Sequence, residues 1–202
     1  MICLISEQSI PNLIGIKQLS HQDDKLIFIS TKKMEDAKKS NNIAYSLEIN
    51  DDIERIIVDE SSLTDINEKL NNRFKHNNTN YIVNITCGTK LMSMAVFDFF
   101  KSNFPDKTEF IYIPINKNYI QYFNEDRTKE NITTSINLVE YLKAYGITIT
   151  DHNNNPDDSC FDVFEKYKKC NFNNSIKTWK DYSNNDQYKN GAWFEDYCYF
   201  NL

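Results

Sequence analysis

Short apolar runs alternate with stretches of helical spacing from the start of the chain to about residue 145. Apolar runs bounded by polar turns predict strands, and apolar positions three or four residues apart predict helices. The predicted strands are residues 3–5, 26–29, 53–58, 81–85, 110–113 and 119–123. The predicted helices are residues 9–19, 32–39, 59–73 and 91–100, the first opened by a Ser9 cap with Pro11 in its first turn.

This order of strands and helices indicates an α/β, Rossmann-like fold: a mostly parallel sheet with helices on both faces, followed by a short helical extension. Residues 26–29 are wholly apolar and residues 81–85 nearly so, as expected of strands buried on both sides. Such sheets bind ligands at the carboxyl ends of their strands. The loops after three predicted strands, at 6–8, 30–32 and 86–90, therefore predict the place of a site.

Beyond residue 146 the sequence changes character. Residues 151–158 form a polar hinge, and residues 161–167 have the pattern of a short amphipathic helix. Residues 191–200 are apolar and aromatic, so a helix there needs a partner surface. We therefore divide the chain into a ligand-binding α/β domain at 1–146, a linker or helical connector at 147–190, and the start of a further domain or a docking helix at 191–202.

The composition narrows the class of protein. The formal net charge is -6 and charged residues make up 26%, so the surface as a whole is not that of a nucleic-acid binder, although a local cationic site is compatible with it. No apolar run is long enough to cross a membrane. The five cysteines include no CxxC pair and the three histidines are scattered, which favours reduced thiols in the cytoplasm and no metal site.

The loop Thr86-Cys87-Gly88-Thr89-Lys90 leaves a buried strand and enters a helix. Free amide donors at a helix N-terminus suit a phosphate, Gly88 allows a close approach of the backbone, and Lys90 adds a full charge. The spacing matches neither the Walker A loop nor the G-x-G-x-x-G fingerprint. On spacing alone, a phosphate loop and a plain strand-to-helix turn are equally good interpretations.

The neighbouring loops favour the phosphate interpretation. Ser6-Glu7-Gln8 offers side chains that can read a base or a ribose, and Ser30-Thr31-Lys32-Lys33 offers contacts to a second phosphate. The alternative for the second loop is an ordinary helix cap with solvated lysines. Cys87 at a helix N-terminus has the position of a nucleophile, but no histidine lies near it in sequence, so a small buried residue is the favoured interpretation. The apolar residues of the following helix are predicted to be core: Met92, Met94, Phe97, Phe99 and Phe100.

Three motifs in order resemble those of the CRISPR-associated Rossmann-fold (CARF) sensors, and most closely the CARF–nuclease effectors of type III CRISPR defence. They are residues 4–12, 29–32 and 84–92. The family loop usually reads Thr-Gly-Gly-Thr-Lys, so Cys87 departs from it, and a positive φ there would be strained. The resemblance implies that the ligand-binding residues are Ser6, Glu7, Gln8, Ile10, Pro11, Asn12, Ser30, Thr31, Lys32, Thr86, Cys87, Gly88, Thr89, Lys90 and Met92.

In the family, two CARF domains pair about a two-fold axis and bind a cyclic oligoadenylate between them. The resemblance therefore implies a homodimer that senses cyclic oligoadenylate, commonly cyclic tetra-adenylate, with no other cofactor and no catalytic residue in this chain. A two-fold symmetric ring suits an isologous dimer that offers each loop twice.

Residues 191–197 resemble the opening helix of the family's restriction-endonuclease-like domain, whose later acidic and Glu-x-Lys elements are missing here. We expect a nucleic-acid substrate and a divalent metal only where that domain is present. This chain is expected to bind the ligand and to relay the closure of the dimeric sensor through residues 147–190. Two alternatives stay open. One is a ring nuclease that slowly cleaves the cyclic ligand through its own ribose 2′-hydroxyl, and the other is a nucleotide-binding domain outside CRISPR defence.

Overall fold

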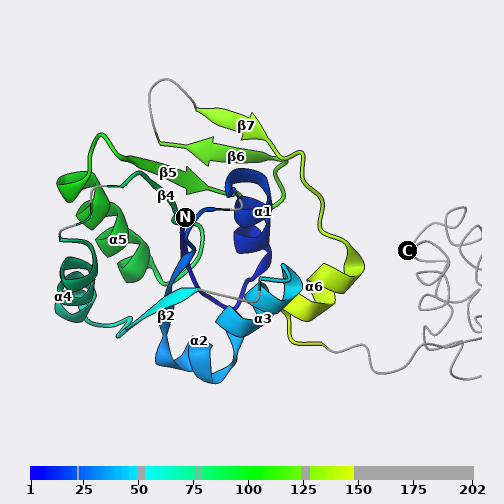
Figure 1. Cartoon of the computed structure of the whole chain (residues 1–202), viewed down its shortest axis with the longest axis horizontal. Helices are drawn as coiled ribbons and strands as arrows, with labels where there is room; N and C mark the ends of the chain where they lie inside the picture. Colours follow the sequence, from blue (N-terminus) through cyan, green and yellow to red (C-terminus); the bar gives the residue numbers. More distant parts are fainter. Residues whose placement is uncertain (22, 50–52, 76, 78, 124–127, 148–202) are drawn as a thin grey trace, which may run out of the picture. The chain divides into compact units, whose positions relative to one another are not determined.

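The computed structural model describes residues 1–21, 23–49, 53–75, 77, 79–123 and 128–147 of the chain. Within them the backbone builds a seven-stranded sheet, in the order β3-β2-β1-β4-β5-β6-β7 (Figure 1). The strands are β1 (Ile2–Leu4), β2 (Ile27–Thr31), β3 (Glu54–Val58), β4 (Tyr81–Asn84), β5 (Thr108–Tyr112), β6 (Tyr119–Tyr122) and β7 (Lys129–Asn131).

The sheet is mostly parallel, which confirms the prediction from the strand and helix pattern. β1 pairs in parallel with both β2 and β4, β2 pairs with β3, and β4 pairs with β5. β6 and β7 are antiparallel additions at one edge. The chain moves outward from β1 through β2 to β3 and then returns to place β4 on the other side of β1. The direction of winding therefore switches between β1 and β4, where sheets of this type open a crevice at their carboxyl ends.

Helices cover both faces of this sheet (Figure 1). They are α1 (Ile10–Leu19), α2 (Lys32–Asp36), α3 (Lys39–Ser46), α4 (Leu63–Phe74), α5 (Lys90–Asn103) and α6 (Leu138–Ala144). Side chains of α4 and α5 share one core cluster with Ile2 and Leu4, whereas side chains of α1, α2, α3 and α6 share another with Cys3 and Ile5. Because successive side chains of a strand point to opposite faces, the short strand β1 supplies both cores.

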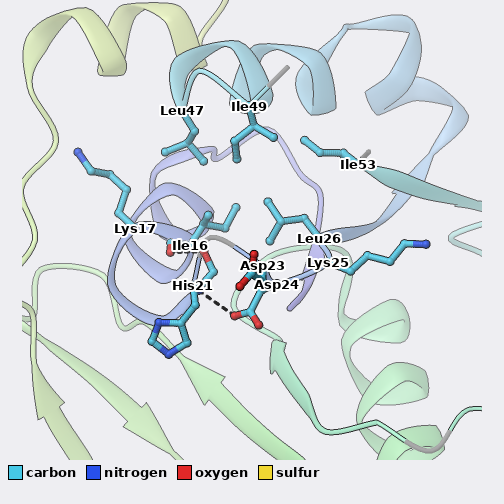
Figure 2. Close-up of a pocket in the computed structure, with 11 residues that line it drawn as sticks. Ile16, Lys17, His21, Asp23, Asp24, Lys25, Leu26, Leu47, Ile49 and Ile53 are labelled. Atoms are coloured by element: carbon cyan, nitrogen blue, oxygen red, sulfur yellow. Dashed lines mark hydrogen bonds between the residues drawn. The ribbon is translucent and has the colours of Figure 1, made fainter. Parts of the chain in front are cut away.

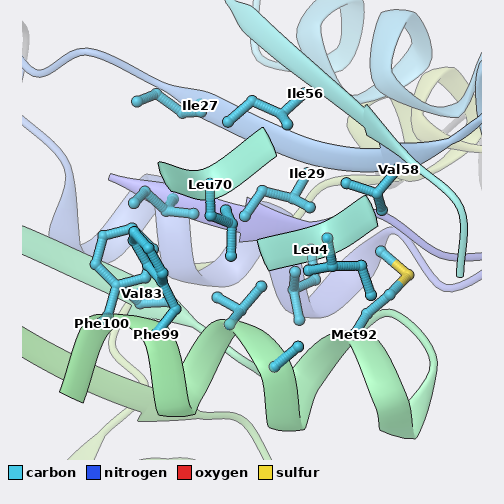
Figure 3. Close-up of a cluster of buried hydrophobic side chains, with 14 of the residues drawn as sticks. Leu4, Ile27, Ile29, Ile56, Val58, Leu70, Val83, Met92, Phe99 and Phe100 are labelled. Carbon is cyan, nitrogen blue, oxygen red and sulfur yellow. The ribbon is translucent and has the colours of Figure 1, made fainter. Parts of the chain in front are cut away.

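The larger core lies between the sheet and the α4–α5 pair (Figure 3). Leu4, Ile29 and Val83 come from adjacent central strands, and Leu70 and Phe100 from the two helices, and all five are completely buried. Aromatic rings fill the end of this core farthest from the loop before α5: Phe74 lies 5.0 Å from Phe100 and 5.7 Å from Tyr81, ring centre to ring centre. The core therefore holds β1, β4 and α5 rigidly together.

The second helical segment and the end of the described region differ from the sequence prediction. Residues 32–39 are split between α2 and α3, because Lys38 takes a left-handed φ of 56° between them. Most of α3, all of α6 and the edge strand β7 were not predicted. The sequence of β7 is Lys-Glu-Asn, with no apolar position to reveal it. A capping box at the start of α6, in which Asn137 and Glu140 bond each other's backbone N–H groups, is the sequence signal that could have found that helix.

Two further predictions about side chains are wrong. Met94 was expected in the core, but its side chain faces solvent at 69% exposure, whereas Met92, Phe99 and Phe100 are buried as predicted and Phe97 is partly buried. Ser9 occupies the cap position of α1, but its hydroxyl does not bond the helix N-terminus. It donates instead to the backbone oxygen of Ala144, 3.0 Å away, because both residues are completely buried where α6 meets the start of α1.

Glu54 on β3 binds two cations, which makes stability depend on pH. Arg73 on α4 holds its carboxylate with two side-chain hydrogen bonds, and Lys25 Nζ lies 3.0 Å from it. The hydrogen bond from Arg73 is the main cause that lowers the pKa of Glu54 to about 2 from its usual 4.5. Because the pKa is lower in the folded state, the contribution to stability is complete above pH 4.5 and is lost as the pH falls toward 2.

We expect Glu54→Gln to melt at a lower temperature than the wild type at neutral pH. The difference in Tm should shrink as the pH falls through the window between the two pKa values, because the wild-type carboxylate is then protonated and pairs no better than an amide. Melting curves of both proteins across this range check the prediction. A Tm difference that stays constant with pH would show that Glu54 stabilises the fold by packing alone.

No helix among the described residues is long and apolar enough to cross a bilayer. The predicted hinge at 151–158, the amphipathic helix at 161–167 and the helix at 191–200 lie outside the described residues and stay predictions.

Candidate ligand-binding site

Two loops meet at the switch point of the sheet, one after β1 and one after β4. If Gly88 carried a Cβ atom, that atom would lie 3.2 Å from Leu4 Cβ, so the second loop passes directly over the end of β1. The Cys87 thiol lies 3.4 Å from the backbone oxygen of Gln8, which ties it to the first loop. The structure thus brings residues 6–8 and 86–90 together at the carboxyl ends of β1 and β4.

The phosphate-loop candidate ends in a well-formed helix start. Gly88 has a φ of +82°, a conformation that residues with side chains rarely adopt. Thr89 caps α5, since its hydroxyl oxygen accepts the N–H of Met92 at 3.2 Å. The N–H groups of Lys90 and Leu91 belong to the first helical turn and meet no acceptor among the described residues. This arrangement offers backbone donors and the positive end of a 14-residue helix to an anion.

Lys90 supplies the full charge of this loop. Its side chain is exposed, and no carboxylate among the described residues pairs with it. Lys32, by contrast, is held by Asp36 at 2.9 Å. An unpaired lysine at the start of a helix is free to bind an incoming anion without breaking an existing ion pair.

Thr86 has a different role from the one its position suggests. Its hydroxyl donates to Asn84 Oδ1 at 2.5 Å and accepts the backbone N–H of Ile113 at 2.9 Å. A hydroxyl has only one hydrogen, and Asn84 takes it. Thr86 therefore shapes the loop, while the hydroxyl hydrogen of Thr89 remains available to a ligand.

Cys87 is a packing residue in this structure. The side chain is buried, and burial raises the pKa of the thiol to about 11. A neutral thiol at physiological pH is a poor nucleophile, which agrees with the sequence interpretation of a small buried residue. The positive φ of this loop falls on Gly88 rather than Cys87, so the departure from the family pattern causes no backbone strain.

The loop after β1 carries a charged cluster that the sequence reveals only in part. Glu7 is exposed, and its carboxylate lies 3.1 Å from Lys39 Nζ and 3.7 Å from Lys33 Nζ. The hydrogen bond from Lys39 is the main cause that lowers the pKa of Glu7. Two lysines against one glutamate leave this side of the crevice cationic, although the whole chain is acidic.

Lys39 and Tyr145 are the residues of this cluster that sequence reasoning missed. The Lys39 side chain is only 13% exposed and its Nζ lies 5.5 Å from the centre of the Tyr145 ring. The Tyr145 phenol is close enough to the Ser9 backbone and to Cys87 for both to influence its pKa, which burial raises. Lys39 lies in the unpredicted helix α3 and Tyr145 follows the unpredicted helix α6, so no motif pointed to them.

The loop after β2 contributes less open surface. Ser30 is completely buried and Thr31 nearly so, and Thr31 caps α2 by accepting the Met34 N–H at 3.3 Å. With Lys32 bound to Asp36, this geometry fits the helix-cap alternative that the sequence left open. Lys33 is the residue of this loop that reaches the others, through Glu7.

The remaining predicted residues lie behind the loops. Ile10 and Pro11 are half-buried at the start of α1, whereas Asn12 and Met92 are completely buried. The Asn12 side chain donates to the backbone oxygen of Leu4 at 2.8 Å and accepts from Asn84 at 3.1 Å. In this conformation neither Asn12 nor Met92 presents side-chain surface to a ligand.

A separate hollow of about 610 Å³ lies at the amino ends of the strands (Figure 2). Its walls include Ile16, Leu26 and Leu47, and its rim includes Lys17 and Lys25. Both lysines are already paired, Lys17 with Glu140 at 2.6 Å and Lys25 with Glu54 at 3.0 Å. No residue predicted to bind the ligand lines this hollow, so we place the candidate site at the opposite end of the sheet.

Comparison with protein families gives one match that covers most of the chain. The model of the Card1 CARF domain matches residues 1–141. The chain belongs to this CARF family. The match includes all three motifs and the loops after β1, β2 and β4. No curated protein is similar enough in sequence to match the chain.

Solved structures share the fold of this chain. Can2 from Sulfobacillus thermosulfidooxidans, solved in complex with cyclic tetra-adenylate, superposes with a TM-score of 0.57 at 24% identity over 72% of this chain. Protein VC1899 from Vibrio cholerae superposes with a TM-score of 0.61 at 14% identity over 82% of this chain. The chain covers only 40% and 44% of the lengths of these two proteins.

Proposed function

We propose that this CARF domain is a sensor of cyclic tetra-adenylate that binds the ring between two copies of the chain. The observation that carries the proposal is the unpaired Lys90 at the start of α5, beside backbone donors at the switch point of the sheet. Each adenylate of the ring contributes one phosphate. An anion at a helix N-terminus is bound by the free backbone N–H groups and is stabilised by the helix dipole. Membership of the CARF family and the cyclic tetra-adenylate in Can2 support the same ligand.

The proposed dimer is supported by symmetry and by the number of cationic groups in one crevice. One crevice offers one Lys90 and one cluster of Glu7, Lys33 and Lys39. A ring of four adenylates carries four phosphates, so a single copy of the chain leaves some of the phosphate charges without a cationic partner. Two copies about a two-fold axis present every loop twice to a ring that itself has two-fold symmetry.

Competition binding separates this proposal from a general nucleotide-binding domain. A fluorescent cyclic tetra-adenylate is bound to the full chain and displaced with unlabelled cyclic tetra-adenylate, linear tetra-adenylate and adenosine monophosphate. The proposal predicts that the cyclic ligand displaces the label at far lower concentration, since a closed ring is already ordered for a two-fold site. Equal or better displacement by the mononucleotide would contradict it.

We further propose that the sensor relays ligand binding through α6. Ser9 directly follows the 6–8 loop, and its buried hydroxyl bonds the last residue of α6, Ala144. Tyr145 extends this contact to Lys39 and so to Glu7. A ligand that moves residues 6–8 therefore acts on the segment that leads directly into residues 148–202.

Ser9→Ala tests this relay. Loss of the hydroxyl leaves the Ala144 carbonyl without its partner, which should lower the free energy of unfolding by about 1–3 kcal/mol. Hydrogen exchange of residues 138–147 is measured with and without cyclic tetra-adenylate. We expect the wild type to change its exchange on binding and Ser9→Ala to lose most of that change while still binding the ring. Ser20→Ala is the matched control, because its hydroxyl donates to Ile16 O in the last turn of α1. An unaltered response in Ser9→Ala would contradict the relay.

A further inference from the structure

Two asparagine side chains are completely buried between α1 and the sheet, directly behind the phosphate-loop candidate. They are Asn12 on α1 and Asn84 at the end of β4, and neither has measurable exposure. An amide buried in this way is costly unless its donors and acceptors find partners. Both side chains are hydrogen-bonded, so the pair forms a satisfied polar network inside an otherwise apolar layer.

The hydrogen bonds of this network run in one chain across three neighbouring strands. Asn12 Nδ2 donates to Leu4 O at the end of β1, at 2.8 Å. Asn84 Nδ2 donates to Asn12 Oδ1 at 3.1 Å, and Asn84 Oδ1 accepts both the N–H and the hydroxyl of Thr86. Thr86 Oγ1 in turn accepts the N–H of Ile113, just beyond β5. The ends of β1, β4 and β5 are thereby connected through side chains where their backbone ladders stop.

The network fixes the direction in which the chain leaves β4. The bond from Asn84 Oδ1 to the N–H two residues later is the pattern of an Asx turn, which bends the backbone without a regular turn. Thr86 is hydrogen-bonded to both Asn84 and Ile113, and the following Gly88 lies over Leu4 just before α5 begins. The hydrogen bonds of Asn84 and Ile113 to Thr86 thus hold the start of the 86–90 loop in one conformation.

We propose that Asn12 and Asn84 are positioning residues for the ligand of the 86–90 loop, acting through Thr86 without touching the ligand. This inference rests on the proposed function. It adds that a buried asparagine of the first motif affects ligand affinity without contacting the ligand. A preorganised loop loses less freedom when the ligand arrives, so affinity depends on residues that the ligand never meets.

Calorimetric titration of cyclic tetra-adenylate into the full chain tests the proposal, with Asn12→Ala as the first variant. Its side chain is completely buried and does not reach the ligand, so any effect on affinity must be indirect. We expect the dissociation constant to rise on the order of tenfold. Because Asn12→Ala also removes a partner from Leu4 O, Ile120→Val is the control for reduced stability, since Ile120 is completely buried in a cluster on β5 and β6. It should lower Tm and leave the dissociation constant unchanged.

A second pair of variants keeps the test sound if Asn12→Ala folds poorly. Thr86→Val removes both side-chain hydrogen bonds of Thr86, whereas Thr86→Ser retains both. We expect Thr86→Val to bind about as weakly as Asn12→Ala, and Thr86→Ser to bind like the wild type. The double variant of Asn12→Ala and Thr86→Val should bind no more weakly than the weaker of the two single variants, because both substitutions interrupt the same chain of hydrogen bonds.

The possible failures are distinguishable. A wild type that does not bind the ring overturns the proposed function itself. If the wild type binds the ring, and Asn12→Ala has a lower Tm but an unchanged dissociation constant, the positioning role is overturned. The proposed sensor function is then unaffected. Additive losses in the double variant would mean that Thr86 touches the ligand directly, which also overturns the proposal.

Discussion

Lys90→Ala should lower the affinity for cyclic tetra-adenylate by at least about a hundredfold. A charge-assisted hydrogen bond contributes about 1.5–3 kcal/mol, and a two-fold site loses this contact twice. Each 1.4 kcal/mol corresponds to about tenfold in the dissociation constant. Because Lys90 is exposed and has no carboxylate partner among the described residues, its removal should leave the fold intact. Calorimetry for affinity and a melting curve for stability check both parts.

Lys101→Ala is the matched control for this variant. Lys101 lies near the other end of the same helix, is exposed, and its loss changes the net charge by the same amount. The account predicts near wild-type affinity for it. Equal losses in the two variants would mean that the ring responds to overall charge, and an unchanged affinity in Lys90→Ala would remove the lysine from the site.

Gly88→Ala should weaken binding strongly, by distorting the loop rather than by removing a contact. At a φ of +82°, a residue with a side chain costs about 1–2 kcal/mol more than glycine. The added Cβ would also lie 3.2 Å from Leu4 Cβ and 3.3 Å from Leu4 Cδ1, closer than ordinary contact. The loop relieves this strain only by turning, which moves the N–H groups away from the ligand, so we expect a loss on the order of tenfold to a hundredfold in affinity together with a lower Tm.

Ile66→Val separates the two effects of the glycine variant. Ile66 is completely buried on α4, and the shorter side chain should cost about 0.5–1.5 kcal/mol of stability. Affinity measured well below Tm should stay at the wild-type value in Ile66→Val and fall in Gly88→Ala. Wild-type affinity in Gly88→Ala would show that the loop tolerates another backbone conformation and that the observed φ is not needed for binding.

The central architecture could be predicted from the sequence because its signals are local. Strands such as β2 and β4 are short apolar runs, and the helix after Thr89 is strongly apolar. The place of the candidate site then follows from the rule that such sheets bind ligands at the carboxyl ends of their strands, whereas the strand order is known only from the structure. Met94 was misplaced because an apolar residue on an exposed helix position carries no mark of its exposure.

The parts of the site that escaped prediction depend on distant contacts. Lys39 reaches Glu7 from α3, 32 residues further along the chain, and Ser9 meets Ala144 across 135 residues. Neither pairing leaves a local pattern, because an ion pair or a side-chain-to-backbone bond needs only one suitable group on each side. Likewise, the hydroxyl of Thr86 could be assigned to the fold only once Asn84 and Ile113 were seen on either side of it.

The stoichiometry of binding tests the central claim most directly. Calorimetric titration of cyclic tetra-adenylate into the full chain, with the mass of the complex measured by sedimentation in the same buffer, gives the number of rings per chain. The account predicts one ring bound by two chains, with both copies of the 86–90 loop engaged. One ring per single chain, or no binding at concentrations where the protein is folded, would contradict it.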